Sequence, residues 1–177
     1  MIMRRIVVVG TSGSGKTTVA TRIAKELGLL HVELDSIHWA PNWTEIPDED
    51  FRKQVFEATK GDGWVADGNY RKVRDILWSR ADTLVWLDLS FSVVFWRVLK
   101  RTIGRIINAE VLWNDNIERW NALIGLDSMP LWVIKTYWRR KREYSKLLTQ
   151  AEYSHLHVIK LKTKKDVETL LSNLNNW

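Results

Sequence analysis

The sequence predicts a single α/β domain in which a parallel sheet lies between two layers of helices. Three observations indicate this fold: short apolar runs alternate with stretches of helical periodicity, a glycine-rich loop joins the first strand to the first helix, and the chain has 177 residues. Strands that alternate with helices form right-handed βαβ units with parallel strands. At about 100–200 residues per domain, the length fits one domain over 1–177.

The first predicted unit is a strand, a glycine loop and a helix. Ile6 to Val9 is a β-branched run, as in strands that are buried on both faces of a sheet. From Lys16 onward, apolar residues recur at helical spacing until Gly28, which is a C-cap signal. A second strand is expected over 30–34, although polar residues interrupt it.

The rest of the chain continues this alternation. We expect a loop over 40–47, a helix from Pro47 to Gly61, strands at 64–66, 83–87 and 157–161, and helices over 71–80, 91–107, 130–149 and 167–174. The stretch 108–129 lacks a clean helical period. It predicts a mobile insertion with one short helix, so that a lid covers about 105–130.

Composition narrows the classes of function. The chain carries 27 Lys and Arg against 21 Asp and Glu, and this net charge of +6 indicates an anionic partner: a nucleotide, a nucleic acid or a membrane surface. The absence of cysteine excludes disulfides, thiolate nucleophiles and Cys-ligated metals. Because the apolar runs are too short for a signal peptide or a membrane span, we expect a cytoplasmic protein. Most of the 11 tryptophans are expected in the core.

A phosphate-binding loop is the strongest functional signal. The run Gly10-Thr11-Ser12-Gly13-Ser14-Gly15-Lys16-Thr17 fits G-x-x-x-x-G-K-[ST], after a strand and at the start of a helix. Backbone N–H groups of such a loop and the positive end of the helix dipole bind phosphate, and the lysine reaches the β- and γ-phosphates. We therefore expect ATP to be bound by Gly10, Ser12, Gly13, Ser14, Gly15, Lys16, Thr17 and Thr18.

The expected metal is Mg²⁺, bound by Thr17 and Asp88. The threonine hydroxyl of the loop is a ligand for Mg²⁺ in this motif. Asp88 closes the apolar strand at 83–87, where a carboxylate holds Mg²⁺ in proteins with this loop. The alternative is an aspartate that only ends a strand. Leu89 follows Asp88 where hydrolytic ATPases carry a water-activating glutamate, which favours transfer to another acceptor.

Two further strand ends supply acceptor-side candidates. Asp35 follows the second strand and could orient or deprotonate an acceptor hydroxyl, or could be an N-cap. Asp67 and Arg71, in the run Asp67-Gly68-Asn69-Tyr70-Arg71, could bind an anionic acceptor, or could belong to a glycine turn.

Arginines flank the insertion on both sides. One set is Arg97, Arg101 and Arg105, and the other is Arg139, Arg140 and Arg142. Guanidinium groups of this kind stabilise transition-state charge when a lid closes. We expect Arg101 and Arg139, or its neighbour Arg140, to act in catalysis with Lys16 and Asp35, and Arg101 to contact ATP as well. A solvated basic face is the alternative for any single arginine.

With these residues, the chain resembles the adenylate-kinase-like P-loop proteins, and more closely the bacterial topology modulation (FlaR-related) proteins. The shared segments are 10–18, 34–39 with 41–43, 64–70, 81–88, and Trp113-Asn114-Asp115-Asn116 with Glu118. The resemblance implies a five-stranded parallel sheet, ATP and Mg²⁺ binding, and a small helical lid. His38 stands where adenylate kinases carry an arginine, which argues against AMP as the acceptor.

The sequence therefore predicts a kinase that transfers the γ-phosphate of ATP to an unidentified small-molecule or nucleotide acceptor. Two alternatives stay open. One is an ATP-dependent regulator that binds nucleic acid through the basic helix after Pro130, and the other is a slow ATPase. Trp39 and Trp43 flank the loop after Asp35, where they could form an aromatic wall for a base or sugar, although a place in the core is the alternative.

Overall fold

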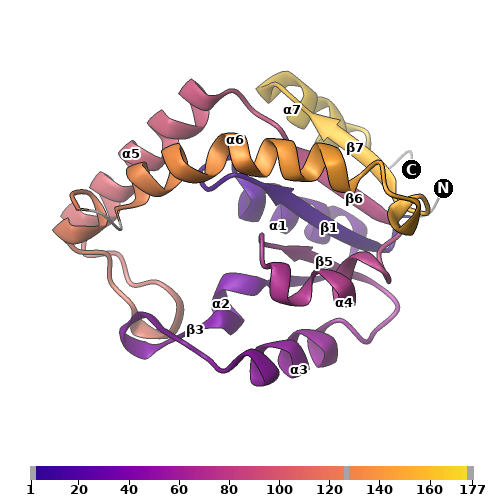
Figure 1. Cartoon of the computed structure of the whole chain (residues 1–177), viewed down its shortest axis with the longest axis horizontal. Helices are drawn as coiled ribbons and strands as arrows, with labels where there is room; N and C mark the ends of the chain where they lie inside the picture. The colour runs from indigo at the N-terminus through magenta and orange to yellow at the C-terminus, as the bar shows by residue number, and fades with distance from the viewer. Residues whose placement is uncertain (1–2, 126–127, 175–177) are drawn as a thin grey trace.

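The computed structural model describes residues 3–125 and 128–174, and a parallel sheet lies at its centre (Figure 1). The strands of this sheet follow the order β2-β5-β1-β6-β7. Their bounds are Arg5–Gly10 for β1, Leu30–Glu33 for β2, Trp64–Asp67 for β5, Thr83–Leu87 for β6 and His157–Leu161 for β7. All four pairings are parallel, so the carboxyl ends of the strands lie at one edge. This confirms the predicted five-stranded α/β fold in the described part of the chain.

Helices cover both faces of the sheet. They are α1 (Lys16–Leu27), α2 (Leu34–His38), α3 (Asp48–Ala58), α4 (Arg74–Trp78), α5 (Phe91–Ile107), α6 (Met129–Leu147) and α7 (Lys164–Ser172). In β1, Ile6 and Val8 pack in one core with α1 and α7. Val7 and Val9 pack in the other core with side chains of α3, α4 and α6. Burial on both faces explains why the strand is uniformly apolar.

Helices α5 and α6 also pack against each other beyond the sheet, as Figure 1 shows. Their shared small core contains Leu89, Val94, Val98, Val133 and Tyr137. The outer faces of both helices and part of the insertion are exposed and carry tryptophans, so the expectation of mostly buried tryptophans is wrong for the described residues. Trp64, Trp78 and Trp86 are buried, whereas Trp96, Trp120, Trp132 and Trp138 are exposed. No helix of the described residues is long and apolar enough to cross a membrane.

Several predicted boundaries differ from the structure. The strand expected over 30–34 ends at Glu33, and α2 begins at Leu34. The helix expected over 71–80 is a 3-10 turn (Arg71–Val73) followed by α4. The loop expected over 40–47 contains a 3-10 turn (Pro41–Trp43) between two short antiparallel strands, β3 (Trp39–Ala40) and β4 (Thr44–Glu45). The last helix begins earlier than predicted because Thr163 and Asp166 form a capping box.

The insertion between α5 and α6 holds 3-10 turns instead of an α-helix in its described residues. These turns are Trp113–Asp115 and Trp120–Ala122, and an isolated antiparallel bridge pairs Val111 with Ile117. In Figure 1 the insertion loops from the end of α5 toward α2 and β3. It therefore reaches the same side of the molecule as Asp35.

Candidate functional site

The predicted phosphate loop lies between the end of β1 and the start of α1. Gly13 has φ 81° and Gly15 has φ 93°, both in the left-handed region that glycine adopts at no steric cost. A Cβ on Gly13 would lie 2.4 Å from Val98 Cγ2 and 2.8 Å from the Val94 carbonyl, both on α5. The loop is thus shaped by its glycines and packs directly against α5.

Polar groups of this loop are available for an anion. The Ser14 hydroxyl is buried and has no hydrogen-bond partner, which is unusual for a buried polar atom. The Ser14 carbonyl accepts a hydrogen bond of 3.3 Å from Nη1 of Arg97. Ser12 is half-buried, whereas Thr18 is exposed on α1. A loop with an unpaired buried donor at the start of a helix fits a phosphate group.

Lys16 lies at the centre of a cluster of charges. Burial lowers the pKa of Lys16 to about 8, against the opposing effect of the carboxylates of Asp35 and Asp67. Arg140 and Arg101 lower this pKa further. Charges from four other segments, two carboxylates and two arginines, therefore act on the Lys16 ammonium group.

Asp35 is held by a tyrosine from the neighbouring strand end. The Tyr70 hydroxyl donates a hydrogen bond of 2.5 Å to Oδ1 of Asp35. Burial and the charge of Asp35 raise the pKa of Tyr70 well above its ordinary value, so this hydroxyl stays protonated. The second carboxylate oxygen of Asp35 is not part of this bond, and the side chain keeps partial exposure. Asp35 can therefore accept a further proton or hydrogen bond.

A second carboxylate corner surrounds Thr17. The Thr17 hydroxyl lies 2.8 Å from Oδ2 of Asp67 and 3.3 Å from Oε1 of Glu33. Glu33 and Asp67 are neighbours in the register of β2 and β5. Burial raises the pKa of Glu33, and the nearby Asp67 and Asp35 raise it further, while a hydrogen bond from Trp113 lowers it. Nε2 of His31 lies 2.8 Å from the other oxygen of Asp67.

These oxygen donors fit a divalent cation such as Mg²⁺. Thr17, Asp67 and Glu33 present a hydroxyl and two carboxylates, which are the hard ligands that Mg²⁺ prefers, and Mg²⁺ in kinases takes the rest from phosphates and water. No group of three or more His, Cys, Asp or Glu in ligating geometry occurs among residues 3–125 and 128–174. A site of this kind thus depends on the phosphates for completion.

Asp88, the predicted metal ligand, has two lysine partners. Its carboxylate oxygens lie 3.1 Å from Nζ of Lys141 on α6 and 3.1 Å from Nζ of Lys160 on β7. Lys160 also lies 3.8 Å from the centre of the Trp86 ring. Asp88 is buried and follows Leu87, which pairs with Gly10 of the phosphate loop, but both carboxylate oxygens face ammonium groups. The geometry therefore favours Asp67 over Asp88 as the neighbour of Thr17.

Two of the flanking arginines reach the cluster. Burial lowers the pKa of Arg101 on α5 and of Arg140 on α6, and Asp35 opposes this shift at both. Nε of Arg101 and Nη1 of Arg140 are buried with no hydrogen-bond partner. Arg139 is exposed, on another face of α6. Of the two alternatives, the structure thus brings Arg140 and not Arg139 to Lys16.

Arg71 lies apart from this cluster. Its side chain is 79% exposed, and its Nε lies 3.6 Å from Glu143. Glu143 in turn receives a hydrogen bond of 2.7 Å from Arg74. The sequence singled out neither Glu33 nor His31. The signal for both was present, because they are the polar residues that interrupt the apolar run of β2.

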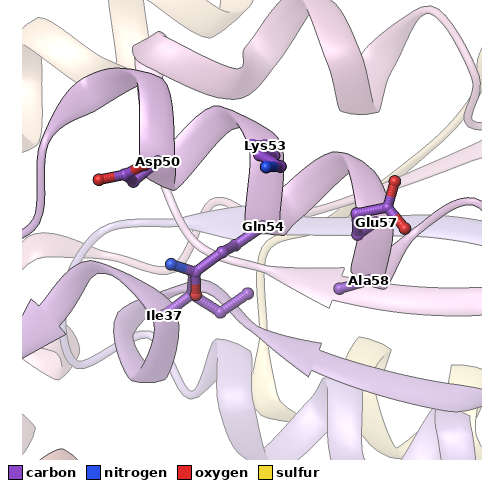
Figure 2. A pocket seen from close by; sticks show the side chains of 6 residues that line it. All are labelled: Ile37, Asp50, Lys53, Gln54, Glu57 and Ala58. Carbon is purple, nitrogen blue, oxygen red and sulfur yellow. The ribbon is translucent and has the colours of Figure 1, made fainter.

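A separate hollow lies between α2 and α3, on the outside of the domain. Figure 2 shows its lining, with Ile37 from α2 and five side chains from α3: Asp50, Lys53, Gln54, Glu57 and Ala58. The charged residues of its rim are exposed. Because neither the phosphate loop nor Glu33, Asp35 or Asp67 lines this hollow, we do not assign it to the candidate site.

Comparisons with known proteins agree with a nucleotide-binding site. A family model described as an AAA domain matches residues 6–105, which is more than half of the chain. A curated relative, the shikimate kinase of Persephonella marina, is 30% identical over 115 residues, which cover 54% of this chain and 67% of the relative.

Solved structures with a similar fold are also kinases. A shikimate kinase from Bacteroides thetaiotaomicron aligns with a TM-score of 0.59 and 17% identity over 99% of this chain and 98% of its own. A gluconokinase from Sinorhizobium meliloti 1021 aligns with a TM-score of 0.54 and 21% identity, over 98% of this chain and 92% of the gluconokinase chain. A sugar kinase from Janibacter sp. HTCC2649 aligns with a TM-score of 0.53 and 20% identity, over 99% of this chain and 94% of the sugar kinase chain. At these identities the likeness shows the fold alone.

Proposed function

The chain belongs to the AAA domain family, and from this membership we propose that it is a small-molecule kinase that uses ATP. The observation that carries the proposal is the charge cluster at the phosphate loop, where Asp35, Asp67, Arg101 and Arg140 all act electrostatically on Lys16. Phosphoryl transfer requires mainly positioning and charge stabilisation, and this cluster supplies both.

The donor side consists of the phosphate loop and the Thr17 corner. We propose that 10–18 bind the phosphates of ATP, with Lys16 on the β- and γ-phosphates and the Ser14 hydroxyl as a further donor. Thr17, Asp67 and Glu33 would hold Mg²⁺, which neutralises charge on the β- and γ-oxygens when bound. The predicted role of Asp88 as a ligand remains a prediction, and its lysine partners argue against direct contact.

On the acceptor side, Asp35 accepts the proton of the attacking hydroxyl. As the acceptor oxygen forms its bond to the γ-phosphorus, the bond from that phosphorus to the β–γ bridging oxygen breaks and ADP leaves. The hydroxyl proton passes to the Asp35 carboxylate, which Tyr70 holds in place. Arg101 and Arg140 present unpaired guanidinium donors to the negative charge of the transferring group or of an anionic acceptor.

The acceptor class follows from the relatives and the charge of the site. The relatives bear the names of shikimate, gluconate and sugar kinases, so we propose a small hydroxylated acceptor, with a carboxylate that can pair with an arginine. The exposed Arg71, predicted to bind the acceptor, would need to move to reach it. Likeness to the topology modulation proteins supports the same nucleotide chemistry and names no acceptor. The use of ATP also fits the predicted cytoplasmic location.

A transfer assay tests this function directly. The protein is mixed with Mg²⁺ and ATP labelled at the γ-phosphate, and with shikimate, D-gluconate, neutral sugars, nucleosides or nucleoside monophosphates. We expect label in one of the hydroxylated acids or sugars, and no label with the Lys16→Ala variant. Label only in inorganic phosphate would identify a slow ATPase, and no use of ATP at all would contradict the proposal.

The nucleic-acid alternative predicts a distinct observation: the affinity for DNA or RNA falls steeply as the salt concentration rises. Part of the basic charge of α6 is engaged within the protein, since Lys141 pairs with Asp88 and Arg140 lies near Asp35. This favours the kinase. A titration with duplex DNA at two salt concentrations separates the two functions.

A further inference from the structure

Two turns with left-handed residues meet on the acceptor side of the site. Asn42 and Trp43 have φ of 60° and 54°, and Asn114 and Asp115 have φ of 54° and 62°. Non-glycine residues rarely adopt this conformation, and where they do so the surrounding structure must hold them. We call the contact between residues 40–43 and residues 113–117 the interlock.

Asn116 is the central residue of the interlock. It is 2% exposed, and its Oδ1 accepts a hydrogen bond of 2.6 Å from the backbone N–H of Trp43. Its Nδ2 donates to the carbonyl of Ala40 at 3.0 Å and to the carbonyl of Trp113 at 2.7 Å. One amide side chain therefore satisfies backbone groups of both turns.

The interlock also reaches the helix that carries Asp35. Nδ2 of Asn114 donates to the carbonyl of Trp39 at 2.6 Å and to that of Ser36 at 3.3 Å, at the end of α2. Because the carbonyls at a helix end have no partner within the helix, these bonds fix the position of α2. They thereby constrain Asp35, which lies one residue before Ser36.

Aromatic side chains add to this contact. The Trp43 indole N–H donates to the Ile117 carbonyl at 3.3 Å, and the Trp43 ring packs against those of Trp39 and Trp113 with centres 5.6 Å and 6.4 Å apart. Trp113 also makes a hydrogen bond to Glu33, and this bond lowers the pKa of Glu33 against the effect of burial. The three rings therefore contact one another edge to face, between α2 and the insertion.

The middle of the insertion is anchored on α5. Glu118 is buried, and its Oε1 accepts a hydrogen bond of 2.9 Å from Nη1 of Arg105. Arg105 lies one helical turn after Arg101. The insertion thus connects the loop after Asp35 to the helix face that carries a transition-state arginine.

From these contacts we propose that Asn116 is a positioning residue for the acceptor, and that the interlock fixes Trp39, Trp43 and Trp113 as the wall that selects it. The inference rests on the proposed kinase function. The interlock makes its backbone hydrogen bonds with α2 and the loop after it, and its side-chain contact with the Thr17 corner is the bond from Trp113 to Glu33. Its loss is therefore expected to affect the acceptor more than the nucleotide.

The Asn116→Asp variant tests the proposal, because a carboxylate keeps the shape of the side chain but cannot donate to the carbonyls of Ala40 and Trp113. Asn121→Asp, on an exposed residue of the same insertion, has the same change of charge and serves as the control. We expect Asn116→Asp to raise the KM for the acceptor identified in the transfer assay at least tenfold. The Kd of the Mg²⁺ complex of a non-hydrolysable ATP analogue should stay within twofold, and the control should change neither.

Equal weakening of analogue and acceptor binding in Asn116→Asp, or an unchanged KM, would overturn the proposal. If this variant does not fold, Trp43→Phe retains an aromatic ring but removes the N–H that donates to the Ile117 carbonyl, and the same KM-against-Kd comparison applies. Absence of any transfer by the wild-type protein is a failure of the proposed function instead. In that case amide hydrogen exchange tests the interlock. The amides of residues 36–46 and 111–118 should lose protection together in Asn116→Asp and keep it in Asn121→Asp. Loss of protection in only one of the two segments of Asn116→Asp would contradict the interlock.

Discussion

The Tyr144 hydroxyl donates a hydrogen bond of 2.8 Å to Oδ1 of Asn69, and Asn69 binds both polar backbone groups of Gly10. The Gly10 N–H lies 3.3 Å from Oδ1, and Nδ2 lies 2.6 Å from the Gly10 carbonyl. Tyr144 lies one helical turn after Arg140 on α6. Three hydrogen bonds through Asn69 therefore join the helix that carries Arg140 to Gly10, the first residue of the phosphate loop.

Removal of this hydroxyl should weaken nucleotide binding. Tyr144→Phe leaves the ring in place and removes one buried hydrogen bond, so we expect a loss of about 1 kcal/mol in the free energy of unfolding. Tyr137→Phe is a matched control, because its hydroxyl donates to the Leu89 carbonyl at 2.9 Å, away from Asn69. Urea unfolding and titration with an ATP analogue are the measurements. Only Tyr144→Phe should raise the Kd, by a few-fold, and an equal effect in both variants would contradict a specific link.

Lys16→Ala should abolish ATP-dependent transfer while the protein stays folded. The lysine contributes a charge at the phosphates, and its burial costs free energy, so the loss of the side chain does not require loss of the fold. Circular dichroism checks folding, and the labelled-ATP assay checks transfer. Full activity in this variant would rule out the site described above.

Neighbouring arginines on α6 provide an internal comparison. Arg140→Ala should reduce kcat by about 10²-fold, because one preorganised donor to transition-state charge is lost. Arg139→Ala should leave kcat within about threefold of the wild-type value. The Arg139 side chain is exposed, and an exposed charge stabilises a transition state by less than about 1 kcal/mol. Steady-state kinetics of the two variants distinguishes them. The reverse ranking would restore Arg139 as the catalytic arginine.

The metal-binding carboxylate can be identified by the Mg²⁺ dependence of transfer. Asp67→Asn should increase the Mg²⁺ concentration needed for half-maximal activity by about tenfold or more, because Asp67 contacts Thr17. Asp88→Asn should lower the melting temperature, since it leaves Lys141 and Lys160 without their shared anion, and should change the Mg²⁺ requirement less. A larger Mg²⁺ effect at Asp88 would support the ligand that the sequence predicts.

Nucleotide affinity should depend on pH through Lys16. Its pKa of about 8 lies below its ordinary value, so the free protein loses this positive charge as the pH rises through 8. A bound triphosphate favours the cation and raises the pKa, so binding takes up a proton between about pH 8 and pH 10. Calorimetry at pH 9 in buffers of different ionisation enthalpy measures this uptake. Constant affinity from pH 7 to pH 9.5 would contradict it.

The phosphate loop could be predicted from the sequence because its chemistry is local. Eight consecutive residues specify the turn, the lysine and the helix start, and the structure has β1 and α1 on either side of them. The alternation of strands and helices likewise predicts a parallel sheet, since each unit depends on its own residues. Asp35 was predicted because polar residues at the carboxyl ends of parallel strands face the ligand.

The carboxylate corner at Thr17 depends on the order of strands, which the sequence does not reveal. β5 lies between β2 and β1, and only this order makes Glu33 a neighbour of Asp67. The two lysines that pair with Asp88, Lys141 on α6 and Lys160 on β7, come much later in the chain. Arg139 and Arg140 point about 100° apart on a helix, and the face of α6 that meets the site is determined by packing. Long-range contacts therefore decide each of these points.

The core shared by α5 and α6 has a mechanical consequence. Val94 and Val98 of one helix pack with Val133 and Tyr137 of the other, so Arg101 and Arg140 are mounted on one rigid unit. As long as this core is intact, α5 cannot be displaced relative to the sheet without α6, so the distances of both guanidinium groups from Lys16 change together. The positive charges of Arg101 and Arg140 would then act at the phosphate site as one coupled pair and not as two independent side chains.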